Sequence, residues 1–390
     1  MKIVVIGGAG AMGRVVVQDL SESPEVTEIL VADFNESMVR EIVEKFRDKR
    51  IIGCFADARR VEELAKVIQG YDAVINCAQH DFNLEVMQAC LNADCHYNDL
   101  GGLWHITKKQ LKLFDDFQKI GKTAVCGIGA APGVTNILAR YAYDRLDEVR
   151  EVRCAAALSE MGPECKDIFL PAYSIQTIME EYDMDSYQWI DGEYRTTPPM
   201  TGHMEVVFPE PIGRKVCIHT LHSETATIPD SFKDKGIQTV TWRLSLPSWF
   251  EEKAQFLAWL GFASTEAVTV QGVQIVPREV LTKVVEKHLE SKQPIKAPDI
   301  IGCLQVEVFG KKNGKEIQYT VSTLCGTHSR WGVSNLTQSP AAIVAQMQVK
   351  GMIKDAGVWA PEKVIDPEYF LAELKKREMN TFVTIKEQPF

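Results

Sequence analysis

Residues 2–13 have the sequence "KIVVIGGAGAMG". Its apolar residues 3–6 are typical of a parallel strand buried on both faces. Residues 8–13 then match G-x-G-x-x-G, and a stretch of helical character follows. In that pattern the first glycine allows a tight turn, the second lets the backbone approach a pyrophosphate, and the third lets the helix pack on the strand. The sequence therefore predicts a dinucleotide site at Gly8, Gly10, Ala11, Met12 and Gly13.

An acidic residue stands where this pattern requires one. The run "TEILVAD" ends at Asp33, twenty residues after Gly13. A carboxylate there accepts hydrogen bonds from the adenosine ribose and repels a 2′-phosphate, which favours NAD as the cofactor. The alternative is a structural turn followed by a chance aspartate. Arg40, Arg59 and Arg60 keep NADP as a second option.

Strand and helix patterns alternate through the first 130 residues or so. Strand-like runs end near residues 57, 77 and 99, and amphipathic stretches separate them. This alternation predicts an α/β fold with a Rossmann-like, doubly wound parallel sheet. Ligands of such sheets lie beyond the carboxyl ends of the strands, so four further residues are expected at the cofactor: Asp57, Ala58, Cys77 and Ala78.

From about residue 151 the pattern changes to a second, mostly antiparallel α+β domain. Two alternating runs meet at Asn313-Gly314, which predicts a hairpin. Ser339 as N-cap and Pro340 as first helical residue predict a helix to about residue 354, and another helix is expected at 367–377. The acidic, tyrosine-rich residues 179–195 are expected to form a surface excursion. The predicted domains are 1–140, 141–336 and 337–390.

Composition excludes several classes of function. The chain has 390 residues and a net charge of −10, which disfavours nucleic acid as a partner. It has no apolar run long enough for a membrane helix and no signal-peptide pattern, which indicates a cytoplasmic protein. Ten cysteines without C-x-x-C or zinc spacing indicate reduced thiols and no metal site.

Two glycine-containing turns are candidates for the substrate site. "NDLGG" places Asp99, Gly101 and Gly102 at a strand end, where Asp99 either faces the substrate or caps a helix near Leu103. "GIGAAPGVTN" contains Pro132, Gly133 and Asn136. This turn either holds an anionic group of the substrate at a helix N-terminus or is only a crossover between domains.

Three residues of the second domain are candidates for polar chemistry. Arg243 lies in "VTWRLSLP" and either binds a substrate carboxylate or lies on a solvated strand face. His222 and Glu224 in "HTLHSET" suit proton transfer, although a hydrogen-bonded structural histidine is the alternative.

With these motifs in place, the chain resembles the saccharopine dehydrogenase superfamily, and within it the lysine 6-dehydrogenases. The resemblance covers most of the chain and rests on "GGAGAMG", "DLGG", "APGVTNILA", "HT", "TWR" and "GVWAPEKVI". It departs at "LHSETATIP" and at "LSLP" after Arg243, so the substrate can differ from lysine. The resemblance implies that residues 141–336 bind substrate and form contacts of a homodimer or larger homo-oligomer. It also implies that residues 337–390 return as helices to the first domain.

The resulting hypothesis is an NAD-dependent oxidoreductase that acts on the C–N bond of an amino acid or amine, foremost by oxidative deamination of L-lysine through an imine. In it His222 or Glu224 moves the proton, Arg243 binds the carboxylate and Asp99 binds the ammonium group. Two alternatives stay open. One is a saccharopine- or carboxynorspermidine-type reductase that forms a secondary amine. The other is a protein that senses NAD(H) without turnover.

Overall fold

Seven parallel strands form the first sheet of the computed structural model, which describes residues 1–160, 169–292, 299–326 and 335–387. The sheet order is β17-β6-β5-β4-β1-β2-β3, and every pairing in it is parallel. The strands are β1 Lys2–Ile6, β2 Glu28–Asp33, β3 Ile51–Phe55, β4 Ala73–Asn76, β5 His96–Asp99, β6 Thr123–Val125 and β17 Gly357–Trp359. The Rossmann-like parallel sheet expected from the sequence is confirmed.

Helices cover both faces of this sheet. Val5 of β1 belongs to a core with α1 Gly13–Ser21, α2 Glu36–Phe46 and α12 Asn335–Val349. Val4 belongs to the opposite core, with α3 Val61–Ile68 and α4 Asn83–Asn92. Both faces of the sheet are therefore buried, which explains the uninterrupted apolar run of β1. Three more helices follow along the chain: α5 Trp104–Gln110, α6 Phe114–Lys119 and α7 Val134–Tyr143.

The second sheet also has seven strands, in the order β18-β16-β15-β7-β12-β8-β9. Only β7 and β12 pair in parallel, so the sheet is mostly antiparallel, as expected. The strands are β7 Glu148–Glu160, β8 Ser186–Ile190, β9 Glu193–Thr197, β12 Thr239–Ser245, β15 Ile300–Lys312, β16 Lys315–Gly326 and β18 Asn380–Glu387. The hairpin turn at Asn313-Gly314 is confirmed, and both residues have positive φ.

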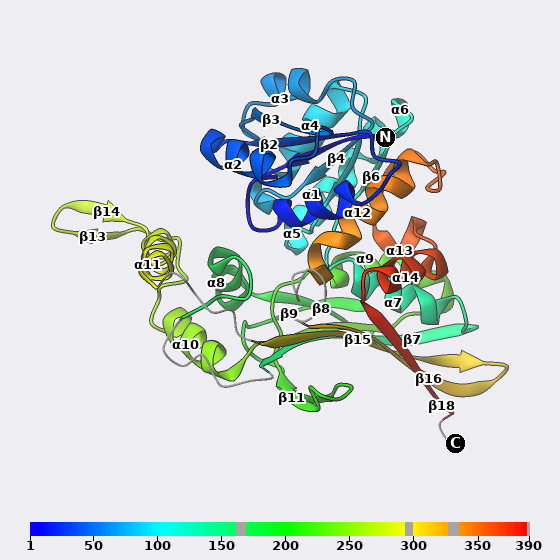
Figure 1. Cartoon of the computed structure of the whole chain (residues 1–390). Helices are drawn as coiled ribbons and strands as arrows, with labels where there is room; N and C mark the ends of the chain where they lie inside the picture. Colours follow the sequence, from blue (N-terminus) through cyan, green and yellow to red (C-terminus); the bar gives the residue numbers. More distant parts are fainter. Residues whose placement is uncertain (161–168, 293–298, 327–334, 388–390) are drawn as a thin grey trace.

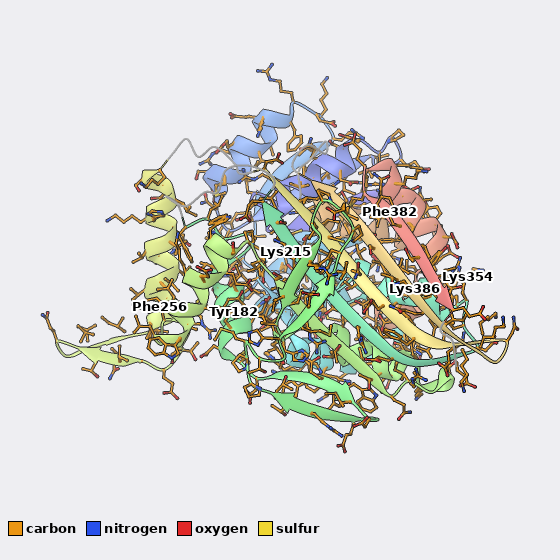
Figure 2. The ribbon with its side chains drawn as sticks, turned by 90° about the horizontal axis from the view of Figure 1, so that it is seen from below. Tyr182, Lys215, Phe256, Lys354, Phe382 and Lys386 are labelled. Atoms are coloured by element: carbon orange, nitrogen blue, oxygen red, sulfur yellow. The ribbon has the colours of Figure 1, made fainter. Side chains whose placement is uncertain are left out.

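The remaining elements surround the second sheet. In Figure 1 the first sheet and its helices lie above the second sheet, and the hairpin of β13 and β14 extends away at the left. From below, β10 and β11 cross the lower face of the second sheet, with Lys215 on β11 (Figure 2). The elements are α8 Ile175–Asp183, β10 Met204–Val207, β11 Arg214–Cys217, α9 Glu224–Ser231, α10 Ser248–Trp259, β13 Val268–Val270, β14 Val273–Ile275, α11 Pro277–Ser291, α13 Pro361–Val364 and α14 Pro367–Lys376.

Three local expectations need correction. Helix α12 begins at Asn335, so Pro340 lies inside it, and the Ser339 hydroxyl donates to the buried Asp19 (2.5 Å) instead of capping the helix. Residues 179–190 are not a surface excursion, because they end α8 and form β8 with several buried side chains, whereas residues 191–195 are exposed, as expected. The last strand, β18, pairs with β16 in the second sheet, whereas only helices were expected after residue 337. Residues 388–390 lie outside the described part of the chain.

Helix α12 returns to the first domain and packs on α1. An ion pair joins the end of α14 to α1 as well. Arg377 donates from Nε and Nη2 to the two carboxylate oxygens of Asp19 on α1, at 2.7 and 2.8 Å. The Asp19 side chain is fully buried. The domain bounds themselves stay a prediction.

Replacing Arg377 with alanine is expected to lower the free energy of unfolding by about 3 kcal/mol, because a buried carboxylate then loses its cation. Lys376→Ala is the matched control, since the Lys376 side chain is 69 % exposed in its pair with Glu373. That variant should change stability by less than about 1 kcal/mol. Urea denaturation followed by circular dichroism measures both. Equal losses in the two variants would contradict this role of Arg377.

Candidate active site

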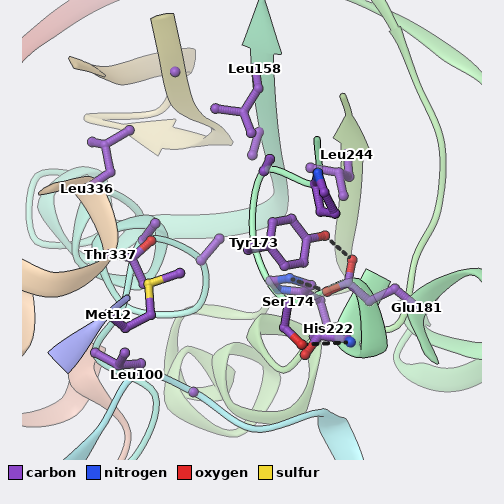
Figure 3. A pocket seen from close by; sticks show the side chains of 18 of the residues that line it. Met12, Leu100, Leu158, Tyr173, Ser174, Glu181, His222, Leu244, Leu336 and Thr337 are labelled. Atoms are coloured by element: carbon purple, nitrogen blue, oxygen red, sulfur yellow. Dashed lines mark hydrogen bonds and ion pairs between the residues drawn. The ribbon is translucent and has the colours of Figure 1, made fainter. Parts of the chain in front are cut away.

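A cavity of about 650 Å³ lies at the carboxyl ends of β1, β4 and β5 and faces the second sheet. The first domain contributes Met12, the loop from Cys77 to His80, and the turn from Leu100 to Leu103. The second domain contributes apolar and aromatic walls that include Leu158, Tyr173, Trp242, Leu244, Trp249 and Phe250. Figure 3 shows Tyr173, Glu181 and His222 grouped on one side, with Met12 and Leu100 on the other.

The glycine turn has room for a ligand at one position only. A Cβ added at Gly8 would meet Val5 O at 2.8 Å, and one at Gly13 would meet Gly7 O at 2.2 Å. These two glycines are required by packing. A Cβ at Gly10 would find only Gly7 O, at 3.3 Å, so the structure around Gly10 does not explain its lack of a side chain. Close approach of a pyrophosphate explains it, and the turn therefore fits a dinucleotide.

Three of the other expected cofactor residues, Asp33, Cys77 and Ala78, lie next to this turn, and Asp57 and Ala58 follow β3. Asp33 ends β2, and its carboxylate accepts from Ala9 N (3.3 Å) and Asn35 N (3.0 Å), which ties the glycine turn to β2. Cys77 and Ala78 line the cavity beside Met12. Asp57 is bound by Arg59 through two side-chain hydrogen bonds, of 2.8 and 2.7 Å, and these hold its pKa at about 2. Ala58 follows it at the same sheet edge.

His222 is the polar centre of the opposite wall. Its Nδ1 donates to Oε2 of Glu224 at 2.8 Å, and its ring stacks on Trp242 at 4.0 Å between centroids. The Trp242 indole N–H donates in turn to Thr220 Oγ1 at 2.9 Å. Glu224 is fully buried behind the ring and does not line the cavity. The expected catalytic role of Glu224 is therefore corrected to holding His222, with Nε2 directed away from it.

Glu181 is the acid beside His222, and sequence reasoning missed it. Its Oε1 lies 3.9 Å from His222 Nε2, and its Oε2 accepts from the Tyr173 hydroxyl at 2.6 Å. Burial raises the pKa of Glu181 to about 7, against the opposing effects of His222 and Tyr173. Burial lowers the pKa of His222, but the charge and hydrogen bond of Glu224, with Glu181, outweigh it and raise that pKa. The pair can thus hold or release a proton near neutral pH.

Asp99 does not face the cavity. Its side chain is buried and accepts from Gly101 N, Gly127 N, Tyr97 Oη and Gln110 Nε2, at 2.8, 2.8, 2.9 and 2.6 Å. Both earlier interpretations are wrong, because Asp99 neither reaches the cavity nor caps a helix. It shapes the turn that carries Gly101 and Gly102, and these two glycines do line the cavity.

Arg243 lies on the wrong face of its strand. Trp242 and Leu244 of β12 line the cavity, whereas Arg243 donates to Gly202 O (2.9 Å), Thr241 Oγ1 (3.0 Å) and His219 Nε2 (3.1 Å). Its expected role as carboxylate partner is corrected: it fixes the loop at Gly202. No lysine or arginine lines the cavity within the described residues.

The residues of the glycine turn before α7 differ in where they lie: some line the cavity and others are buried in the core. Pro132 lines the cavity, but Gly133 and Asn136 are buried behind it. Gly133 N donates to Asn136 Oδ1 (2.9 Å), and Asn136 Nδ2 donates to Glu362 Oε2 (2.8 Å) on α13. Gly133 and Asn136 therefore shape this wall and do not reach the cavity.

The fold and this site define a nucleotide-dependent oxidoreductase. Two family models match the chain, the saccharopine dehydrogenase NADP binding domain over residues 3–125 and the saccharopine dehydrogenase C-terminal domain over residues 129–379. The chain therefore belongs to the saccharopine dehydrogenase family and is an enzyme acting on C–N bonds.

Full-length relatives agree with this placement. Carboxyaminopropylagmatine dehydrogenase of Synechocystis sp. is 25 % identical over 96 % of this chain and 95 % of its own length. Carboxynorspermidine synthase of Vibrio alginolyticus is 24 % identical over 93 % and 92 %. The fold matches saccharopine dehydrogenase (L-Glu forming) from Saccharomyces cerevisiae, with a TM-score of 0.74, 16 % identity and 100 % of both chains covered. It also matches homospermidine synthase from Legionella pneumophila in complex with NAD, with a TM-score of 0.71, 13 % identity, and 98 % and 91 % covered.

Gly10→Val is expected to abolish binding of NAD and NADP while the protein still folds, because the added side chain occupies the open space beside the turn. Gly13→Ala should instead destabilise the fold, since its Cβ would lie 2.2 Å from Gly7 O. Isothermal titration with each nucleotide and a thermal melt separate the two effects. Normal nucleotide binding by folded Gly10→Val would refute the phosphate assignment.

Proposed function

We propose that this enzyme interconverts an imine and an amine, and that its reaction is the reduction of an imine formed from a primary amine and an aldehyde or keto acid. The observation that carries the proposal is the Glu181–His222 pair on an apolar wall opposite the nucleotide turn. A nitrogen between these two walls would have a proton donor on one side and the cofactor on the other. Bound nicotinamide supplies hydride to the imine carbon in the reduction.

The protein's part in this reaction is proton handling and orientation. Protonated Glu181 can give a proton to the imine nitrogen, which makes its carbon a better hydride acceptor. As a carboxylate, Glu181 can take a proton from an ammonium group before the reverse reaction. Tyr173 and His222 hold Glu181 in place, and the apolar walls exclude water that would hydrolyse the imine.

Formation of a secondary amine is favoured over lysine deamination because the relatives named above carry the names of carboxylated polyamines and align with 93–96 % of this chain. Lysine deamination stays the second candidate, because its chemistry needs the same proton transfer.

A substrate panel tests the proposal. Diamines, agmatine and L-lysine are each mixed with an aldehyde acid or a keto acid and NADH or NADPH, and loss of reduced nucleotide is followed by absorbance. The proposal expects nucleotide oxidation only when amine and carbonyl compound are both present. Reduction of NAD by L-lysine alone, without activity in any mixture, would favour deamination.

NAD is proposed as the preferred cofactor. Asp33 lies beside the glycine turn, and the arginines that could receive a 2′-phosphate are engaged elsewhere. Arg59 and Arg60 pair with Asp57, and Arg40 pairs with Glu36.

A cytoplasmic homo-oligomer is also proposed. Eight described cysteines are free thiols: Cys54, Cys77, Cys90, Cys95, Cys126, Cys154, Cys217 and Cys303. Exposed apolar side chains gather on α10, directly after it and on the β13–β14 hairpin: Phe256, Trp259, Leu260, Val268, Val270 and Val273. No helix among the described residues is long and apolar enough to span a membrane.

Asp33→Ser is expected to narrow the difference in affinity between NAD and NADP, because the change removes a repulsive carboxylate and its ribose hydrogen bonds. The parent enzyme should bind NAD more tightly. Dissociation constants for both nucleotides, measured by fluorescence titration, check this. Equal affinities in the parent would contradict the preference.

Glu181→Gln is expected to lower kcat by about 100-fold or more, with unchanged nucleotide affinity, because a general acid is lost. In the parent, reduction should slow as pH rises through about 7, since Glu181 then loses its proton, and oxidation should slow as pH falls through about 7. The hydrogen bond from Tyr173 lowers the pKa of Glu181. Tyr173→Phe removes it and should therefore move the pH dependence of both the reduction and the oxidation to higher pH. Steady-state pH profiles measure these shifts, and an unchanged limb in Glu181→Gln would contradict the assignment.

A further inference from the structure

Glu180 and Glu181 are neighbours on α8, but their carboxylates have different partners. Glu181 faces the cavity beside His222, whereas Glu180 is buried away from the cavity and accepts from Arg278 Nη1 through Oε1 at 3.0 Å. Arg278, on α11, also donates to Ala263 O at 2.6 Å and to Asp183 at 3.3 Å. Arg278 is itself buried, so it holds Glu180 in one orientation.

The second oxygen of Glu180 is directed at the first domain. This Oε2 is buried and makes no hydrogen bond within the described residues, but Nε2 of His80 lies 3.3 Å from it. His80 is also buried, with 9 % of its side chain exposed. A buried carboxylate oxygen without a donor is costly, so an arrangement that brings His80 closer is stabilised.

His80 is part of the loop that lines the cavity on the nucleotide side. The loop leaves β4 at Cys77, and Ala78 N donates to Asn76 Oδ1 at 3.1 Å. Asn76 Nδ2 donates in turn to Asn83 Oδ1 at 2.9 Å, so both ends of the loop are anchored. A contact between His80 and Glu180 therefore joins this loop to the helix that carries Glu181.

We propose that His80 is a positioning residue whose Nε2 binds Oε2 of Glu180 and thereby fixes α8, with Glu181, against the nucleotide loop. This inference rests on the proposed function, because it gives Glu181 its place relative to the cofactor. His80, Asp81 and Glu180 could also hold a metal ion together. The direct contact is favoured, since Glu180 Oε1 is already paired with Arg278 and the Asp81 side chain is 51 % exposed.

The contact also has an electrostatic consequence for Glu181. The Glu180 charge adds to the rise in the pKa of Glu181 that burial causes. If the contact is lost and water reaches α8, that pKa should fall toward the ordinary range. The charged and titratable groups around the two glutamates are His80, Tyr173, Tyr182, Asp183, His222, Glu224 and Arg278, and Asp81 and His105 lie next to His80.

Two substitutions of His80 separate the contact from the fold. In His80→Gln the amide nitrogen can take the place of imidazole Nε2, whereas the shorter side chain of His80→Asn cannot reach Glu180. We expect kcat for imine reduction to fall about tenfold in His80→Asn and to stay within about twofold of the parent in His80→Gln. The dissociation constant of NADH should change by less than about twofold in both, and the Glu181 limb of the pH profile should move to lower pH only in His80→Asn.

The partner is tested by a double-mutant cycle. Glu180→Gln should reduce kcat and move the Glu181 limb of the pH profile to lower pH. The double variant His80→Asn/Glu180→Gln should have a kcat no lower than that of His80→Asn. The inference would be overturned by any of four results. The losses in kcat of the two single variants could multiply in the double variant, or His80→Gln could lower kcat as much as His80→Asn. The substitutions could change the affinity for NADH alone, or a chelator could abolish activity.

A readout without turnover keeps the inference separate from the proposed function. Amide hydrogen exchange of α8, residues 175–183, should be faster in His80→Asn than in His80→Gln or the parent. If the parent turns over no substrate of the panel but this difference is seen, the proposed function fails and the contact stands. Identical exchange in all three proteins would overturn the contact itself.

Discussion

The buried carboxylate of Glu224 is the constraint on which the arrangement of the site depends. One oxygen accepts from His222 Nδ1 and the other from the Thr135 hydroxyl, both at 2.8 Å. Beside it, the buried Glu362 accepts from Asn136 and from the Ser231 hydroxyl, also at 2.8 Å. Burial raises the pKa of Glu362. Residues from three distant parts of the chain thus meet in one network.

This network explains why α13, near the end of the chain, packs against α7 and α9. A buried carboxylate is tolerated only when its oxygens have partners, and a half-satisfied network is worse than an apolar core. Thr135 and Asn136 come from α7, Glu224 and Ser231 from α9, and Glu362 from α13. Folding these helices together therefore fixes the His222 ring, and its Nε2 is left directed toward Glu181.

Much of the nucleotide half could be predicted from the sequence, because its signals are local. The apolar run of β1, the glycine turn and Asp33 lie within one βαβ unit, whose spacing follows from backbone geometry. The hairpin at Asn313-Gly314 is local in the same way. For Arg243 the alternation along β12 was correct, but which face of the strand meets the cavity depends on how the second sheet packs, which no local pattern contains.

Glu181 shows the opposite case. In the sequence it belongs to an acidic, tyrosine-rich stretch that looks like a solvated surface. A signal was present in the sequence, since Ile178, Met179 and Tyr182 make that stretch amphipathic and Glu181 falls on the same side as Ile178, where an acid is unusual. Its partners Tyr173 and His222 and the neighbouring contact of His80 are non-local, so only the folded chain brings them together.

The proposed function requires the reacting nitrogen to lie between the nucleotide turn and the Glu181–His222 pair. A crystal structure of the enzyme with oxidised nucleotide and the secondary amine from the most active substrate mixture would show where this nitrogen is bound. We expect the amine nitrogen within about 3 Å of a Glu181 oxygen or of His222 Nε2, with its neighbouring carbon facing the nicotinamide. A nitrogen held by Asp99 or near Arg243, with Glu181 and His222 free of substrate, would contradict it.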